Sequence, residues 1–132
     1  MSHDALASGP DEKPLDVFGR LVMAHLRDAG IRCFDQLAEG TSHSPRDKKL
    51  HQDLRNVGAV GTTAARRAIM HCIDSAIHDF LFRLQDQADS ENPVHVLVRG
   101  VNVIDASDGL HGEPYGRNGW QARFSRFRQA PD

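Results

Sequence analysis

Cysteines and aromatic side chains are scarce in this sequence. It holds only two cysteines, Cys33 and Cys72, and aromatic residues make up 6% of the chain. The wide spacing of the cysteines excludes a C-x-x-C motif, so zinc-ribbon and thioredoxin-like interpretations gain no support. Both cysteines fall within helical apolar patterns, which predicts reduced thiols in the core of an intracellular protein.

A membrane-spanning run and an excess of charge are also missing. No apolar stretch approaches the roughly 20 residues that cross a bilayer. Residues 1–14 lack the basic start and apolar stretch of a signal peptide. The formal net charge is −2, so no global field draws the chain toward nucleic acid or anionic lipid. We therefore expect a cytoplasmic protein with no membrane partner.

Signatures of catalysis are absent as well. The sequence contains no G-x-S-x-G, no H-E-x-x-H and none of the named phosphate-binding motifs. Neither cysteine has the electropositive, exposed setting that activates a thiol. Whether the protein is an enzyme stays open at this stage.

The 132 residues that are present have the size and composition of one globular domain, with 39% hydrophobic and 26% charged residues. The polar start of the chain, with Pro10 and Pro14, predicts a disordered tail over residues 1–13. A single domain is expected over residues 14–128, followed by a second tail over 129–132.

Two helices are predicted in the first half of the domain. Apolar residues recur every three or four positions from residue 15 to 37, which indicates one helix that ends at Gly40, with a kink at Gly30. Its apolar stripe also places His25 in the core, as a hydrogen-bonded histidine. Ser44 and Pro45 are a typical N-cap and first helical residue, so a short charged surface helix should run from there to Gly58.

The third predicted helix, from about residue 63 to 89, is the expected centre of the core. Its apolar positions cover roughly half of a helical wheel, wider than a marginal surface stripe. They are Ala65, Ile69, Cys72, Ile73, Ala76, Ile77, Phe80, Leu81 and Leu84.

The last third of the chain changes character. Alternating β-branched residues around Gly100 predict an antiparallel hairpin within 94–104. A glycine-rich loop follows over 108–119, and a short amphipathic helix should run from Gly119 to about Arg128. The predicted fold is therefore α+β: three helices packed with a two-stranded hairpin and closed by the loop and the short helix.

Candidate metal ligands lie on one face of the third helix. His71, Asp74 and His78 are spaced by three and four residues, nearly opposite the apolar arc. Two imidazoles and a carboxylate could hold a divalent metal if another element added a ligand. The alternative is a solvated polar face on which Asp74 pairs with His78.

The glycine-rich loop is the second candidate site. It carries four side chains that could contact a ligand: Asp108, His111, Glu113 and Tyr115. Glycines let backbone N–H groups approach a ligand closely. The alternative is a purely structural connection, anchored by Tyr115 and Trp120.

An interaction surface is predicted around Phe82, Trp120 and Arg123. Phe82 projects on the polar side of the third helix, so either the loop or a partner subunit should cover it. The arginines that alternate with aromatics near the C-terminus could also bind single-stranded nucleic acid. Because those aromatics have helical spacing, we expect them to dock the short helix, and we expect no nucleic-acid partner.

The segments HDFLF (residues 78–82) and DGLHGEPYG…GW (residues 108–120) resemble a small bacterial family of unknown function, over about residues 15–127. The resemblance implies a bacterial cytoplasmic protein and adds no mechanism. The leading hypothesis is a non-enzymatic module that forms a homodimer or binds a protein partner. The alternative is a metal- or small-ligand-binding protein that uses the histidine face together with the loop, and no other cofactor is expected.

Overall fold

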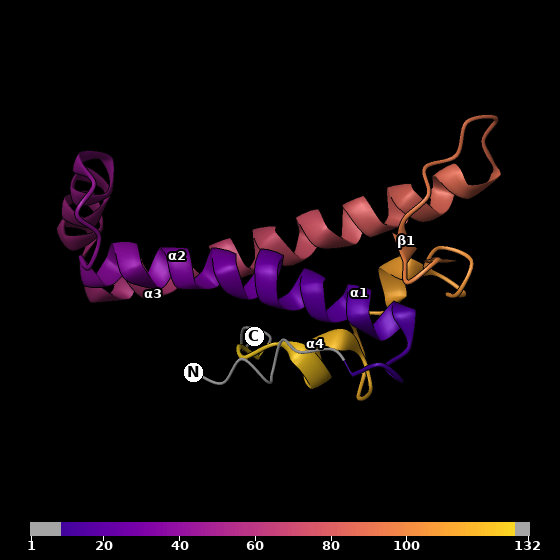
Figure 1. The fold of residues 1–132 in the computed structure, drawn as a ribbon. Helices are drawn as coiled ribbons and strands as arrows, with labels where there is room; N and C mark the ends of the chain where they lie inside the picture. Colours follow the sequence, from indigo (N-terminus) through magenta and orange to yellow (C-terminus); the bar gives the residue numbers. More distant parts are fainter. Residues whose placement is uncertain (1–8, 129–132) are drawn as a thin grey trace.

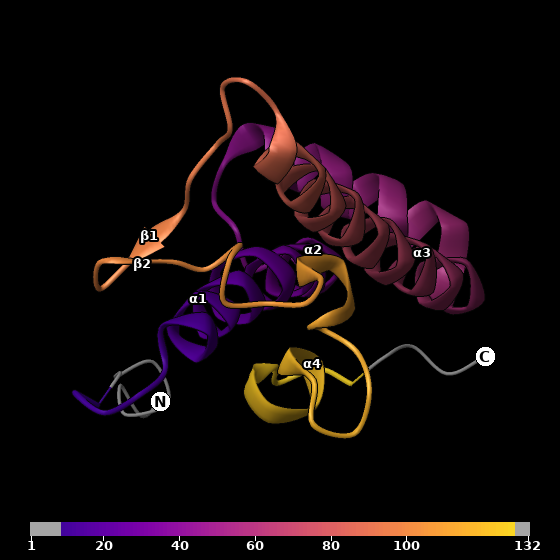
Figure 2. The same cartoon turned by 90° about the vertical axis from the view of Figure 1, so that its right-hand side faces the viewer.

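The computed structural model describes residues 9–128 and shows a helix-dominated α+β fold, as predicted. A long N-terminal helical rod and the helix α3 (Pro45–Asp86) run side by side, and the C-terminal third lies on one flank of this pair (Figures 1 and 2). Most of the predicted N-terminal tail and all of residues 129–132 lie outside the described residues. Residues 9–13 contact the domain, because Arg99 donates to the carbonyl oxygen of Gly9 at 2.7 Å.

One wide turn sets the register of the N-terminal rod. Helix α1 (Pro14–Val22) continues through a π-helical turn, η2 (Met23–Arg27), into α2 (Asp28–Glu39). A π-helical turn holds one residue more than an α-helical turn. Val22, Met23 and Ala24 are buried at the start of this turn, and the buried face continues at Arg27, Asp28, Ile31 and Phe34.

The predicted apolar stripe is wrong at three positions within and after this turn. Leu26 is 51% exposed, and His25 and Cys33 are exposed as well, so none of the three is a core residue. The irregular turn lies at η2 rather than at Gly30. The predicted end is confirmed, since Gly40 follows α2 with a left-handed φ of 76°.

Helix α3 begins as its sequence indicates. The Ser44 hydroxyl accepts a hydrogen bond from the backbone N–H of Asp47 at 3.3 Å, and Pro45 is the first helical residue. At Gly58 the backbone leaves the helical conformation, with φ 78° and ψ 177°, which only glycine adopts readily. The helix predicted from Ser44 therefore ends at Gly58 as expected, and a second helical part of α3 follows it directly. The straight part ends at Asp86, and the short 3-10 turn η3 (Gln87–Asp89) follows.

Only half of the apolar arc of α3 is buried. Of the predicted positions, Ile77, Leu81 and Leu84 are at most 7% exposed, and Met70, which was not among them, is buried as well. Phe80 is 55% exposed, so its prediction as a core residue is wrong. Ile69, at 37%, and Cys72 are also exposed. The physical reason is that a single helical rod covers only part of so wide an arc.

The core lies between the rod and the second half of α3. It is completed by residues that follow the hairpin and by the indole of α4 (Trp120–Phe124). The buried members of the cluster are Val22, Met23, Ile77, Leu81, Leu84, Ile104, Leu110 and Trp120.

The hairpin is present but short. Strands β1 (Leu97–Val98) and β2 (Val101–Asn102) pair antiparallel, with Val98 opposite Val101. Positive φ values at Arg99 and Gly100, 52° and 81°, make the turn that matches the twist of a hairpin. The hairpin lies beside α1 (Figure 2).

The C-terminal helix is shorter than predicted. Helix α4 ends at Phe124, because Ser125 is extended, with ψ 144°. Asp28 holds this extended segment by accepting from the Ser125 hydroxyl at 2.5 Å and from the Arg126 N–H at 2.9 Å. Among residues 9–128, no helix combines the length and apolarity needed to span a bilayer.

Candidate functional site

The glycine-rich loop, Asp108–Gly119, folds over the flank of α3 that carries the histidines. The His111 ring lies edge-on to two rings of α3, with centroids 5.5 Å from His78 and 5.3 Å from Phe82. Tyr115 is 6.1 Å from His78. The loop therefore covers part of the Phe82 ring, which remains 40% exposed.

The predicted metal trio divides between two environments. His71 and His78 are exposed, whereas Asp74 is half-buried and faces α2. The Asp74 carboxylate accepts from Arg27 Nε at 2.6 Å and from the Gln121 amide at 3.3 Å. Together with Tyr115, the trio borders a shallow pocket of about 260 Å³. Within the described part of the chain, no three His, Cys, Asp or Glu side chains are arranged to hold a metal ion.

Burial changes the acidity of two loop residues. The pKa of Glu113 is raised, chiefly because burial penalises the carboxylate, although Arg123 opposes the shift. Burial also raises the pKa of the Tyr115 phenol, with a smaller contribution from the charge of Asp74. His111 Nδ1 is buried and has no hydrogen-bond partner among residues 9–128, whereas Asp108 is exposed. The loop is therefore partly desolvated where it meets α3.

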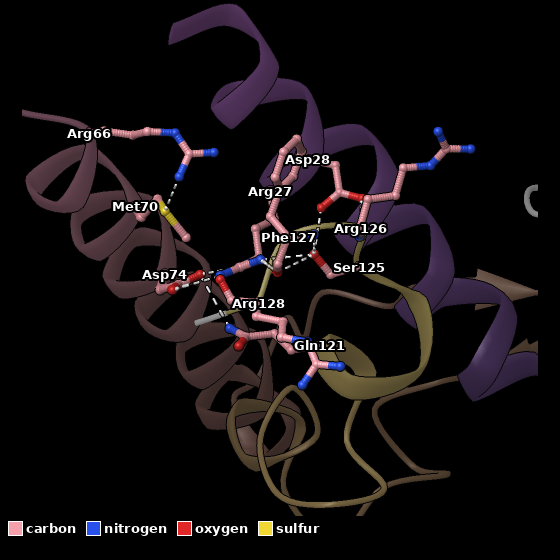
Figure 3. A network of polar contacts seen from close by, with 10 residues as sticks. All are labelled: Arg27, Asp28, Arg66, Met70, Asp74, Gln121, Ser125, Arg126, Phe127 and Arg128. Atoms are coloured by element: carbon pink, nitrogen blue, oxygen red, sulfur yellow. Dashed lines mark hydrogen bonds and ion pairs between the residues drawn. The ribbon is translucent and has the colours of Figure 1, made fainter. Parts of the chain in front are cut away.

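A buried arginine in η2 joins the N-terminal rod to α3 and to the C-terminal segment (Figure 3). Arg27 is fully buried, and it donates to Asp74, to the Ser125 hydroxyl at 2.8 Å and to the carbonyl oxygen of Phe127. Its second terminal nitrogen reaches the Arg128 carbonyl oxygen at 3.4 Å. A buried charge is tolerated only when it is paired and hydrogen-bonded, and these contacts meet both conditions. They fix the backbone of residues 125–128 against the helices.

The predicted interaction surface is corrected at one residue. Trp120 is fully buried, because its indole packs edge-on to Phe18 at 5.9 Å and lies directly over Gly19. A Cβ atom at Gly19 would lie 2.4 Å from the indole, so glycine makes room for it. Arg123 is exposed and pairs with Asp16 at 2.8 Å, which ties α4 to α1.

An apolar face lies on the opposite flank of the helix pair from the loop and α4. We define it by four large side chains, Leu21, Leu26, Ile69 and Phe80, which are 51%, 51%, 37% and 55% exposed. Smaller apolar residues lie between them on the two helices: Cys33, Cys72 and Ala76 are exposed.

Helical geometry places these residues together. Phe80 comes two positions after His78 in the sequence, which is a rotation of roughly 200° around the helix. Phe80 therefore points away from the loop that touches His78. On the rod, Leu26 comes directly before the buried Arg27, and Asp28, which binds the C-terminal segment, comes directly after it. Leu26 and Asp28 therefore lie on opposite sides of the buried face. The two helices meet closely below this face, since a Cβ atom at Gly30 would lie 2.8 Å from Ile73 Cδ1.

Several of these residues carry no usable sequence signal. Arg27 and Asp28 look like ordinary surface charges until the π-helical turn moves them into the buried face. Gly19 could have been noticed, because a glycine within an apolar helical stripe often marks a close approach. No family model, curated protein or solved structure matches the chain.

Proposed function

We propose that this chain is a non-enzymatic interaction module that forms a homodimer by packing its apolar face against the same face of a second copy. The observation that carries the proposal is the half of the apolar arc of α3 that the chain's own core leaves open. Phe80, at 55% exposed, is its largest member.

Clustering distinguishes this face from ordinary surface hydrophobics. Apolar residues that are exposed singly need no explanation, whereas a contiguous patch marks an interaction site. Leu21 and Leu26 on the rod and Ile69 and Phe80 on α3 flank one seam between two packed helices. Exposed apolar side chains along two packed helices suit contact with other helices better than enclosure of a small molecule.

A second copy is the partner that this face fits best. Two antiparallel helical elements with one open apolar flank complete a four-helix arrangement when a second pair packs on them. A two-fold dimer places the same patch on both sides, so the patch must not repel itself. Its large side chains are uncharged, and the neighbouring Asp79 and Arg83 form an ion pair with each other at 3.9 Å.

The test compares oligomeric mass by size-exclusion chromatography with light scattering. Phe80→Glu places a charge in the centre of the face, whereas Val60→Glu makes the same change at a side chain that is 88% exposed on the other flank of α3. The wild type and Val60→Glu should elute as dimers, and Phe80→Glu as a folded monomer. A monomeric wild type, or a Phe80→Glu variant that stays dimeric, would overturn the proposal.

The location in the cytoplasm and the bacterial origin remain part of the same proposal. They are supported by the resemblance carried by residues 78–82 and 108–120.

A further inference from the structure

A cleft that does not involve the apolar face lies near the C-terminal end of the described residues. It has a volume of about 610 Å³ and lies between the end of the glycine-rich loop and the C-terminal segment. Tyr115 and Gly116 contribute from the loop, and Gln121, Arg126 and Arg128 from α4 and the residues that follow it. A volume of this size falls within the roughly 300–1,000 Å³ range of small-molecule sites.

The wall of this cleft is positively charged although the chain as a whole is acidic. Residues 114–128 contain four arginines and no aspartate or glutamate, against a net charge of −2 for the whole chain. Two of the four, Arg126 and Arg128, line the cleft. Their side chains have no ion pair among residues 9–128, and in Figure 3 they extend to opposite sides of the segment that carries them, with Arg128 reaching toward Gln121.

The nearest carboxylates are already occupied. Asp28 accepts from Ser125 and from the backbone of Arg126, and Asp74 accepts from the buried Arg27 and from Gln121. These bonds hold the arginine-bearing segment in place and already occupy both carboxylates. A fixed backbone lowers the entropy cost of binding, because it need not be ordered when the ligand arrives.

We infer that this cleft binds a small phosphate-bearing molecule with a planar ring, of the class of a nucleoside monophosphate. A guanidinium matches the geometry of a phosphate and binds it through paired hydrogen bonds, a role that falls to Arg128, with Arg126 adding to the positive field. The Tyr115 ring, which is 39% exposed and lines the same cleft, offers a surface on which a base can stack.

The experiment is calorimetric titration of the full chain with adenosine monophosphate and, separately, with inorganic phosphate. Arg128→Gln should weaken binding of both probes by about tenfold or more, the effect of losing a charge-assisted hydrogen bond. Arg117→Gln is the matched control, since Arg117 is an exposed arginine of the same segment outside the cleft lining, and it should leave both affinities unchanged. Tyr115→Leu should weaken the nucleotide but not inorganic phosphate.

Three outcomes would overturn this inference. They are no binding of either probe, equal losses in Arg128→Gln and Arg117→Gln, or tight binding of a single-stranded oligonucleotide without binding of the mononucleotide. Thermal unfolding of each variant identifies any misfolded protein, and Arg126→Gln then supplies a second cleft variant. Phe80→Glu should bind the nucleotide like the wild type, because it lies on the other flank of α3, so the cleft and the dimer can fail independently.

Discussion

Phe80 and Leu81 are adjacent in sequence but should respond to truncation in opposite ways. Leu81 is fully buried in the core, whereas Phe80 is 55% exposed on the apolar face. Leu81→Ala should therefore lower the free energy of unfolding of the monomer by about 2–5 kcal/mol. Phe80→Ala should leave that free energy nearly unchanged and act on association instead.

The magnitude for Phe80 follows from its exposed area. A phenylalanine offers on the order of 200 Å², so an exposed fraction of 55% leaves about 110 Å² for a partner to cover. At about 25 cal/mol per Å² this is worth about 2.7 kcal/mol for each copy, and about 5 kcal/mol for the two copies in a dimer. The dimer Kd should then rise by up to about four orders of magnitude.

Urea unfolding at low protein concentration measures the free energy of unfolding of the monomer. Sedimentation velocity over a concentration series measures the dimer Kd. Val60→Ala serves as the control for truncating an exposed apolar side chain elsewhere on α3, and it should change neither. The reasoning is refuted if Phe80→Ala destabilises the monomer as much as Leu81→Ala does while the dimer Kd stays the same.

Three further predictions concern the core and the loop. Arg27→Met should cost about 3–5 kcal/mol of unfolding free energy, because it removes the donor to the Asp74 carboxylate and to the carbonyl groups of the C-terminal segment. Amide hydrogen exchange should show the C-terminal segment opening first. Unchanged protection of that segment would contradict the prediction. Gly19→Ala forces a methyl group against the Trp120 indole and should cost about 1–3 kcal/mol or more in thermal or urea unfolding, whereas Gly112→Ala meets no atom within 4 Å and should cost far less. Because the pKa of Glu113 is raised in the folded state, its contribution to stability is full below its unfolded pKa and is lost as pH rises through the folded pKa. Glu113→Gln should therefore flatten the stability profile over that acidic interval, and an identical profile in both proteins would disprove the role of burial.

Local signals in the sequence were sufficient to predict the helix boundaries near residues 40 and 44 and the hairpin turn. Gly40 as a left-handed stop and Ser44 with Pro45 as a helix start depend on the conformations of single residues, and both are confirmed. The turn at Arg99 and Gly100 is equally local. These features can be predicted because neighbouring residues alone decide them.

The register of the long helices depends on contacts that no local pattern reports. The π-helical turn at Met23–Arg27 shifts the buried face by one residue, and it allows Arg27 to meet Asp74, which lies 47 positions later. The exposure of Phe80 likewise depends on how much of α3 the rod can cover. Periodicity identified an apolar arc correctly but could not say which half of it the chain would bury.

The candidate sites likewise include features that the sequence predicts and features that it does not. Residue types and spacing identified both the histidine flank and the glycine-rich loop, and the structure brings His78 and His111 together. The cleft beside Arg128 was not predicted, because its wall depends on an extended segment that Asp28 and Arg27 hold in place.

Sedimentation equilibrium of the unmodified protein tests the central claim most directly, because it reports mass without reference to shape or to any substitution. For a chain of 14.6 kDa, the open apolar flank of the helix pair predicts a reversible monomer–dimer equilibrium whose mass reaches twice that value as concentration rises. A mass that stays at that of a single chain across the whole concentration range would contradict it.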